Sequence, residues 1–494
     1  MAAEDPTAPF LLARPGHREG LILGLACALL ACLPVLLAVY PQMGDYPAHL
    51  ARYHVMIDGS RSPFLAQFYV FEWKWTGNVG VDLLIQPLST MMGLEPAGRL
   101  IAGAIPVLTG LGILAVEWSL RRRIGVGSLL AMAFIWSPSL LLGFVNFGLS
   151  LAAALFAFAL WVELEGWRWR WVLFMPIGML VWLCHLSGWG VLGLMVLGYE
   201  WSQRPALPAL AAPTPLALPI IPLLLGGGTN GMMSYGALPQ IYKYVIWTKA
   251  MRDQVSELDL VGLALILLLI VVVFQRKRFD GRLGWGAMLT LLGSLLIPRH
   301  LAGGDYADYR LIPVGLMLCC LSIDWRVPRW VLWLAPALFL ARLGVTTATW
   351  AHNSRETAQL LTALDHVPQG ARIASAVLVQ RDRWGMNTFE HIGAYAVLRR
   401  DALVNANFAM PHVHMLHLRP EAAGTGRNRV DPSQRILHWR GEPIDLANFA
   451  PAKGMDYLWY VGDEEPTTLP AGAQVIWRHG HALLARLANP PRAR

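Results

Sequence analysis

A carboxylate and two basic residues lie close together near the start of the chain. Asp45 precedes a tyrosine–proline pair, and His49 and Arg52 follow it after four and then three residues. On a helix this spacing places the three side chains on one face. Asp45 could take a proton from an attacking hydroxyl, while Arg52 and His49 hold an anion. The same pattern is also typical of a helix N-cap followed by a proline in the first turn.

A second group of charged residues is formed by Arg299, Asp305, Asp308 and Arg310, between two apolar segments. The charge pattern described below assigns this loop to the outer side, where arginine is rare and therefore suggests anion binding. A guanidinium can hold two phosphate oxygens at once. Alternatively, Arg310 pairs with Asp305 or Asp308 and only orders the loop. Either aspartate could also supply a ligand to a divalent metal, since Asp45 alone makes a poor site.

Two further cations are candidates for binding a lipid phosphate. Lys243 lies between Tyr242 and Tyr244, in a pattern that suits either phosphate binding or ordinary anchoring at the membrane interface. Arg342 lies within the last apolar segment, where an arginine is a functional candidate by default. Its alternative is to extend its charge to the membrane surface.

The composition identifies a membrane protein with many spans. Of 494 residues, 55% are hydrophobic and 15% are charged, whereas an average soluble domain has about 25% charged residues. The net charge of +8 comes from short basic clusters between apolar runs, without a nucleic-acid-binding motif. The five cysteines show no metal-ligand spacing. Nucleic-acid binding, a structural zinc site and disulfides are therefore not expected.

Hydropathy predicts about eleven membrane spans, and the positive-inside rule places the N-terminus in the cytoplasm. The predicted spans are 21–40, 97–119, 126–143, 146–164, 171–184, 186–202, 208–225, 258–275, 284–298, 310–325 and 329–348. Segment 79–93 is predicted to be an amphipathic helix on the outer surface. Counting it as a span would invert the topology after it.

The sequence predicts a mainly α, polytopic membrane helical bundle in residues 1–350 and an extracytoplasmic α/β domain in residues 351–494. Residues 41–96 form an external first loop, and residues 226–257 begin with glycines and form a mobile lid. In the C-terminal domain, a helix is expected at 356–364. Strands are expected at 373–379, 457–461 and 475–478, with the last two joined by a turn rich in glycine and proline.

This combination resembles the GT-C superfamily of integral-membrane glycosyltransferases. The resemblance rests on Asp45 in the first external loop, on the overall architecture, and on Arg310 in Tyr309-Arg310-Leu311-Ile312-Pro313. Many family members carry a paired acid where this chain has Tyr46-Pro47 after Asp45, which leaves the use of a divalent metal open.

The resemblance implies an inverting transfer of a hexose or pentose from a polyprenyl-phosphate donor to an acceptor hydroxyl on a glycan, lipid or protein. Asp45 would be the base, and Arg310, with Arg52, Lys243 or Arg342, would neutralise the lipid phosphate. The expected location is a bacterial inner membrane with a periplasmic C-terminal domain. The alternatives are an O-antigen ligase or polymerase, a multi-span transporter, and a non-catalytic envelope assembly protein.

Overall fold

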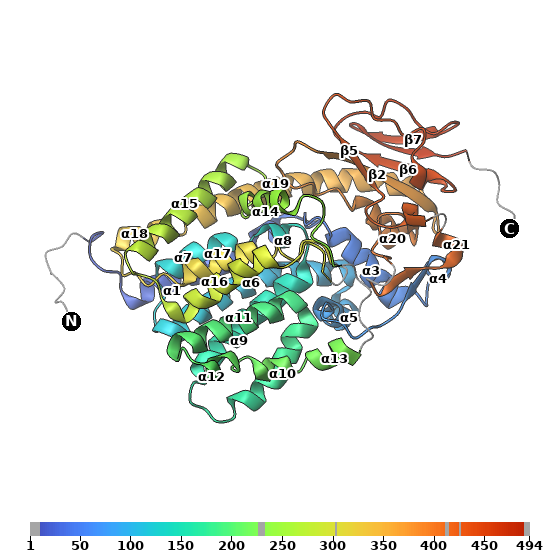
Figure 1. Cartoon of the computed structure of the whole chain (residues 1–494). Coiled ribbons are helices and arrows are strands. Elements are labelled where there is room, and N and C mark those ends of the chain that lie inside the picture. The colour runs from blue at the N-terminus through green and yellow to red at the C-terminus, as the bar shows by residue number, and fades with distance from the viewer. Residues whose placement is uncertain (1–9, 226–232, 302–303, 411–413, 424–425, 489–494) are drawn as a thin grey trace. The chain divides into compact units, whose positions relative to one another are not determined.

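The computed structural model describes residues 10–225, 233–301, 304–410, 414–423 and 426–488 (Figure 1). The chain divides into two compact units. Unit 1 comprises Met1–Leu36, Trp75–Leu83 and Leu100–Ala348, and unit 2 comprises Leu37–Lys74, Leu84–Arg99 and Thr349–Arg494. The C-terminal residues therefore share a unit with much of the predicted first loop, including Asp45.

Unit 1 is helical. Its longer helices are α1 (His17–Leu30), α9 (Val145–Glu163), α10 (Arg170–Cys184), α11 (Leu186–Gln203), α15 (Ser256–Gln275), α16 (Gly281–Leu296) and α17 (Leu311–Leu321). Its shorter helices are α7 (Val126–Ala131), α8 (Pro138–Leu141), α12 (Leu207–Leu210), α13 (Ile220–Leu225), α14 (Pro239–Thr248) and α18 (Arg329–Leu334). Among the described residues, four helices contain residues of both units: α2 (Leu33–Leu37), α5 (Gly80–Met92), α6 (Leu94–Arg121) and α19 (Ala337–Leu361). Within unit 1, α16 packs against both α11 and α17.

Several helices could cross a membrane, as a multi-pass protein requires. In the described part of the chain, five helical segments are long and apolar enough: Arg18–Leu37, Leu94–Arg121, Val145–Glu163, Ser256–Gln275 and Arg329–His366. Shorter apolar helices occupy Val126–Leu141, Arg170–Cys184 and Leu311–Leu321. The predicted count of about eleven spans is not confirmed, and the orientation stays a prediction.

One predicted span, 208–225, is not a continuous helix. Prolines at positions 208, 213, 215, 219 and 222 interrupt it, because proline lacks an N–H and clashes with the preceding helical turn. The segment forms α12, a 3₁₀ turn at Thr214–Ala217, and α13. Hydrophobicity alone could not show this break.

Two other predicted segments acquire defined structure. Residues 79–93 form a helix as predicted (α5), although its place on a membrane surface stays a prediction. The proposed lid 226–257 contains α14, which carries Lys243. Its glycine-rich start, 226–232, lies outside the described residues.

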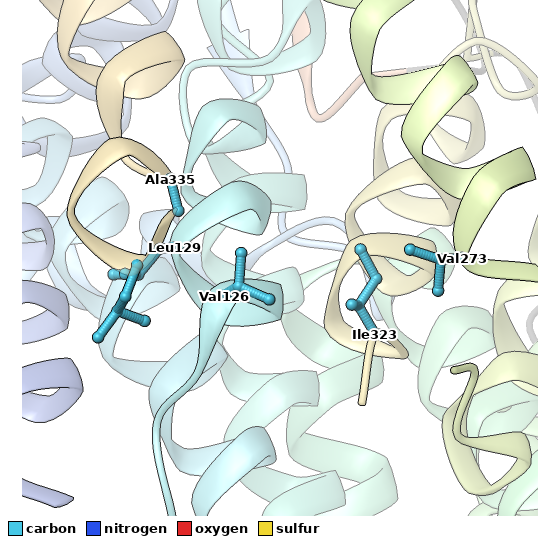
Figure 2. Packing of buried hydrophobic residues seen from close by; sticks show 6 residues of the cluster. Val126, Leu129, Val273, Ile323 and Ala335 are labelled. Carbon is cyan, nitrogen blue, oxygen red and sulfur yellow. The ribbon is translucent and has the colours of Figure 1, made fainter. Parts of the chain in front are cut away.

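An apolar cluster joins several helices of unit 1 (Figure 2). Val126 and Leu129 of α7 lie in one cluster with Val273 of α15, and with Ile323 after the end of α17. Leu332 of α18 and Ala335 complete its buried part. Burying aliphatic side chains of this size stabilises a packed state by about 1.5–3 kcal/mol each in water.

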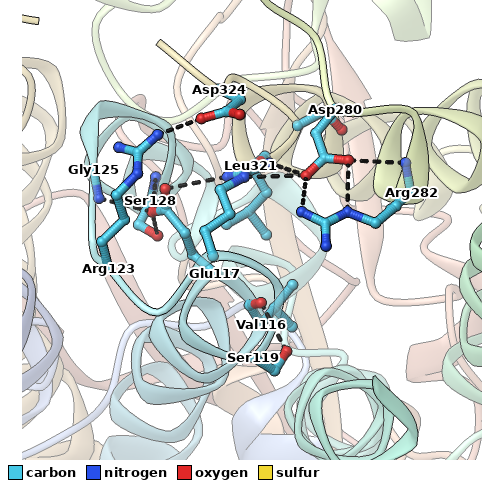
Figure 3. A network of polar contacts seen from close by, with 12 residues as sticks. Val116, Glu117, Ser119, Arg123, Gly125, Ser128, Asp280, Arg282, Leu321 and Asp324 are labelled. Carbon is cyan, nitrogen blue, oxygen red and sulfur yellow. Dashed lines mark hydrogen bonds and ion pairs between the residues drawn. The ribbon is translucent and has the colours of Figure 1, made fainter. Parts of the chain in front are cut away.

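A buried polar network lies where α6 ends and α16 begins (Figure 3). Arg121 donates to Glu117 (3.1 Å), to Asp280 (3.1 Å) and to the Leu321 carbonyl (2.9 Å). Glu117 in turn accepts from the Gly125 amide (3.0 Å) and from Ser128. The network ties the loop after α6 to α7, α16 and the end of α17. Its charges are paired because an unpaired buried charge costs several kcal/mol.

Unit 2 combines short helices with two sheets. Its helices are α3 (Tyr46–Asp58), α4 (Pro63–Phe68), α20 (Tyr395–Arg400) and α21 (Pro420–Ala423). The small sheet pairs β1 (Tyr69–Phe71) with β4 (Leu416–Leu418). The larger sheet has the order β3-β2-β6-β8-β7, with β5 also paired to β2. Its strands are β2 (Arg372–Gln380), β3 (Leu403–Val404), β5 (Arg435–His438), β6 (Tyr457–Val461), β7 (Gln474–His479) and β8 (Ala482–Arg486).

The predicted strands 373–379, 457–461 and 475–478 are confirmed as β2, β6 and β7. The predicted helix 356–364 is the end of α19, followed by a 3₁₀ turn. The sequence interpretation missed β8, which lies between β6 and β7 and pairs antiparallel with both. Its residues Ala-Leu-Leu-Ala-Arg favour a helix locally. Sheet pairing overrides that preference.

We expect Arg121→Met to lower the stability of the purified protein by about 3–5 kcal/mol, because it leaves Glu117 buried without its cation. Asp280 keeps its second partner, Arg282. The measurement is thermal unfolding in detergent. The matched control is Arg122→Met, whose exposed pair with Glu163 is worth at most about 1 kcal/mol. Equal effects of the two substitutions would contradict the role of the network.

Candidate functional site

Asp45 occupies the N-cap position of α3 but does not use its side chain as a cap. Tyr46 and Pro47 begin the helix, as the first-turn pattern predicts. The His49 amide reaches back to the Asp45 carbonyl (3.0 Å). Within the described chain, the Asp45 carboxylate makes no capping hydrogen bond to α3. The carboxylate is therefore available for a role other than capping.

The group that faces Asp45 is His391. Nδ1 of His391 lies 3.6 Å from Oδ1 of Asp45. His391 precedes the 3₁₀ turn Ile392–Ala394, which packs against α3 and against β2. Gly393 permits this close approach, since a Cβ there would lie 2.4 Å from the Ser375 hydroxyl of β2. Packing of this turn against β2 therefore places His391 at the start of α3.

Both ring nitrogens of His391 must act as donors. Nδ1 lies 3.2 Å from the Gly44 carbonyl oxygen, and Nε2 lies 2.7 Å from Oδ1 of Asp431. A carbonyl and an ionised carboxylate only accept hydrogen bonds, and a neutral imidazole has one N–H. The ring is 1% exposed. The geometry therefore calls for a buried imidazolium beside Asp45, with Asp431 as its counter-ion.

The titration behaviour of the three groups agrees with this geometry. Burial raises the pKa of Asp45 to about 7, against the opposing attraction of His391. Burial alone would lower the pKa of His391, but the charge and hydrogen bond of Asp431, with Asp45, raise it to about 9. Burial also opposes ionisation of Asp431, yet His391 lowers its pKa to about 2. Asp45 is thus the member that changes protonation near neutral pH, as a general base requires.

Two other predicted site residues, His49 and Arg52, lie near the Asp45 cluster and make aromatic contacts. Phe408 packs its ring against His49 (5.1 Å between centroids), His391 (5.5 Å) and His414 (5.3 Å). Arg52 is buried on α3, with its guanidinium 5.1 Å from the centre of the Tyr53 ring. Burial, and then the charge of Arg52, lower the pKa of His414 to about 3. His49 and Arg52 therefore belong to the surroundings of the Asp45 cluster.

The cluster also contains the atoms that a metal ion could use. Among the described residues, Glu390, His391 and Asp431 offer ligand atoms that all lie within 4.8 Å of one another. In the structure, however, Glu390 pairs with Arg435, and both nitrogens of His391 face acceptors. A cation would have to replace the His391 protons and Arg435. The arrangement present is a hydrogen-bonded ion pair.

The other predicted site residues lie in unit 1, where most are paired with one another. Arg299 holds Asp305 through two parallel bonds of 2.8 and 3.0 Å, and its guanidinium lies over the rings of Tyr242 and Tyr306. Lys243 donates to Asp308 (2.6 Å) and to the carbonyls of residues 294 and 297. Asp305 and Asp308 are therefore committed to cations of the protein in this structure.

Arg342 is buried within α19 and forms an ion pair with Asp259 of α15. It also donates to the Met251 carbonyl (2.6 Å). Arg342 thus makes an ion pair between two apolar helices. This arrangement differs from both predicted roles, which were binding of a lipid phosphate and extension of the charge to the membrane surface. Pairing of this kind is usual for ionisable residues in membrane segments.

Arg310 lies at the start of α17, where it contacts residues of other helices. It donates to Nε2 of His185 (2.8 Å) and to the Asp305 carbonyl (3.2 Å), and lies 4.2 Å from the centre of the Phe144 ring. The predicted alternative, pairing with the Asp305 or Asp308 carboxylate, stays a prediction.

Sequence reasoning missed His391, Asp431, Glu390 and Arg435. All four lie in the C-terminal region, and His391 is 347 positions from the Gly44 carbonyl that it contacts. Their local sequences carry no catalytic motif. The one available signal was that a lone acid such as Asp45 needs a partner to act as a base near pH 7.

Replacing Asp45 by Asn should stabilise the folded protein at alkaline pH. The pKa of Asp45 is raised in the folded state, to about 7, from about 4 in the unfolded chain. Its stabilising contribution is thus complete below about pH 4 and is lost as the pH rises through 7. Across this range the variant should melt at a higher temperature than wild type, by an amount that grows with pH. The corresponding difference in the free energy of unfolding reaches at most about 4 kcal/mol. For the exposed Asp365→Asn control, a similar pH-dependent gap would contradict the assignment.

Asp431→Asn should have its largest cost in mildly acidic solution. The contribution of Asp431, whose pKa is lowered, is complete above about pH 4 and is lost as the pH falls through 2. That of His391, whose pKa is raised, is complete below about pH 6.5 and is lost as the pH rises through 9. Unfolding of the variant should therefore be easiest relative to wild type between about pH 4 and 6.5, by about 3–5 kcal/mol. A loss of stability that is constant from acid to alkaline pH would rule out this ion pair.

Comparisons with known proteins do not identify this chain. Family models, curated proteins and solved structures were compared with it, and none matches.

Proposed function

We propose that this protein is a membrane glycosyltransferase of the GT-C type, which moves a sugar from a polyprenyl-phosphate donor to an acceptor hydroxyl on the extracytoplasmic face. The observation that carries the proposal is the Asp45 carboxylate, with a pKa of about 7, next to the buried His391. The apolar helices of unit 1 support it, since a polyprenyl chain needs an apolar environment.

In the proposed reaction, the ionised Asp45 accepts the proton of the acceptor hydroxyl. The acceptor oxygen attacks the anomeric carbon from the side opposite the leaving group, and the bond from that carbon to the phosphate oxygen breaks. The configuration inverts and polyprenyl phosphate leaves. His391, held by Asp431, keeps the carboxylate of Asp45 in place and favours its ionised form. His391 is a positioning residue in this scheme.

Neutralising the departing phosphate is assigned to Arg310, because the GT-C resemblance places the phosphate-binding arginine at the start of a late helix and Arg310 directly precedes α17. Lys243, Arg299 and Arg342 already pair with Asp308, Asp305 and Asp259, so binding phosphate would require them to give up a carboxylate. The contacts of Arg310 include a histidine ring, a carbonyl and an aromatic face. Arg52, on the same helix as the base, is the second choice. Stabilising charge that develops on a leaving group is typically a large catalytic term.

We expect Asp45→Asn to reduce transfer by about 10²- to 10⁴-fold, the usual contribution of a general base. In wild type, the rate of transfer should rise as the pH increases through about 7, because only ionised Asp45 accepts a proton.

The effect of the Asp45→Asn substitution is measured by mass spectrometry of lipid-linked sugars and surface glycans. It compares a deletion strain with the same strain carrying wild type, Asp45→Asn, or the control Asp58→Asn from the far end of α3.

A missing sugar in the Asp45→Asn strain, with normal protein levels and a normal glycan in the control, would support the enzyme and name the sugar by its mass. A normal glycan profile with Asp45→Asn would exclude Asp45 as the base. In that case a transporter or a non-catalytic assembly role would replace the proposal. Transfer of a preassembled glycan, rather than one sugar, would identify a ligase or polymerase.

A further inference from the structure

A polar pocket lies at one edge of the larger sheet of unit 2. Strands β2, β5 and β6 run parallel, and they end at Gln380, His438 and Val461. Gln380 is in register with His438, and the chain after Val461 continues beside the end of β2. In sheets of parallel strands, ligands bind outside the carboxyl ends, where the connecting loops diverge.

The pocket is lined by residues that directly end or follow these three strands. They are Gln380, Asp382 and Arg383 after β2, Arg440 after β5, and Asp463 after β6. Its volume is about 250 Å³, slightly below the ~300–1,000 Å³ of sites for drug-sized ligands. Two guanidiniums, two carboxylates and one carboxamide therefore converge on a space suited to a small polar group.

Hydrogen bonds to neighbouring residues hold the segment 462–464, which carries the pocket residue Asp463. The Gln380 side chain donates to Asp463 (2.9 Å). The Tyr460 hydroxyl donates to the Glu464 carbonyl (2.6 Å), and the buried His438 ring lies 3.3 Å from the Glu464 carboxylate. A Cβ at Gly462 would lie 2.3 Å from the Tyr460 hydroxyl, so glycine allows the chain to turn tightly here. Asp463 is thereby presented at a defined position.

The charges in the pocket select the kind of ligand. Asp382 and Asp463 disfavour an anion such as phosphate, and Arg383 and Arg440 disfavour a cation. A sugar hydroxyl suits both, because it accepts from a guanidinium and donates to a carboxylate. From this combination we propose that the pocket binds a neutral saccharide.

This inference does not depend on the reaction at Asp45. The pocket lies on the sheet, and its lining residues take no part in the Asp45, His391 and Asp431 cluster. If the protein transfers sugars, the pocket recognises a saccharide in addition to the one that reacts. If it does not, the pocket still binds saccharide.

The test uses the full-length protein in lipid nanodiscs. A glycan array of neutral oligosaccharides identifies a binding saccharide, and saturation-transfer NMR and titration then measure its affinity. Asp463→Asn and Arg440→Gln should each weaken binding about tenfold, the loss expected for a hydrogen bond to a charged group. Asp365→Asn, an exposed carboxylate elsewhere in unit 2, and Asp45→Asn should bind like wild type.

The proposal is overturned if no neutral saccharide binds at millimolar concentration, or if Asp463→Asn and Arg440→Gln both bind like wild type. It is also overturned if inorganic phosphate displaces the saccharide, because the pocket would then be an anion site. Both residues are exposed, so the variants should fold, and their melting temperatures check this. If Asp463→Asn unfolds, Arg440→Gln alone decides. Retained saccharide binding in Asp45→Asn, together with a normal glycan profile, would refute only the proposed transfer reaction.

Discussion

The candidate site depends on a single buried ring that donates hydrogen bonds on both sides. His391 reaches the Gly44 carbonyl with one nitrogen and Asp431 with the other, and this requires a positive charge in a place without solvent. The charge is tolerated because Asp431 is ionised beside it. It also limits how far burial raises the pKa of Asp45, which stops at about 7. Without the imidazolium, burial would keep Asp45 protonated at neutral pH and therefore unable to accept a proton.

The same physical rule governs the charged residues of unit 1. Arg121, Lys243 and Arg342 each hold at least one buried carboxylate. In an apolar helical unit, an ionised group without a partner would cost more than the helix packing returns. Lys243, Arg299 and Arg342, which looked like ligand-binding groups in the sequence, are therefore paired with carboxylates of the protein.

Unit 2 presents its chemistry at two distinct places. The Asp45 cluster forms where α3 meets the turn after β2, at His391. The polar pocket forms where β2, β5 and β6 end. Both places result from the sheet, since the parallel strands bring together loops that are far apart in the sequence.

The sequence by itself determined the class of protein and the local elements. Long apolar runs specify helices, short apolar runs with β-branched or aromatic residues specify β2 and β6, and Asp45 before Tyr46-Pro47 specifies the start of α3. Such features depend on neighbours within a few residues. The tertiary structure decided the partners: His391 and Asp431 for Asp45, Asp259 for Arg342, and β8 between β6 and β7. These pairings depend on burial and on contacts between residues that are far apart in the sequence, and no local pattern encodes which of many acids, histidines and arginines will meet.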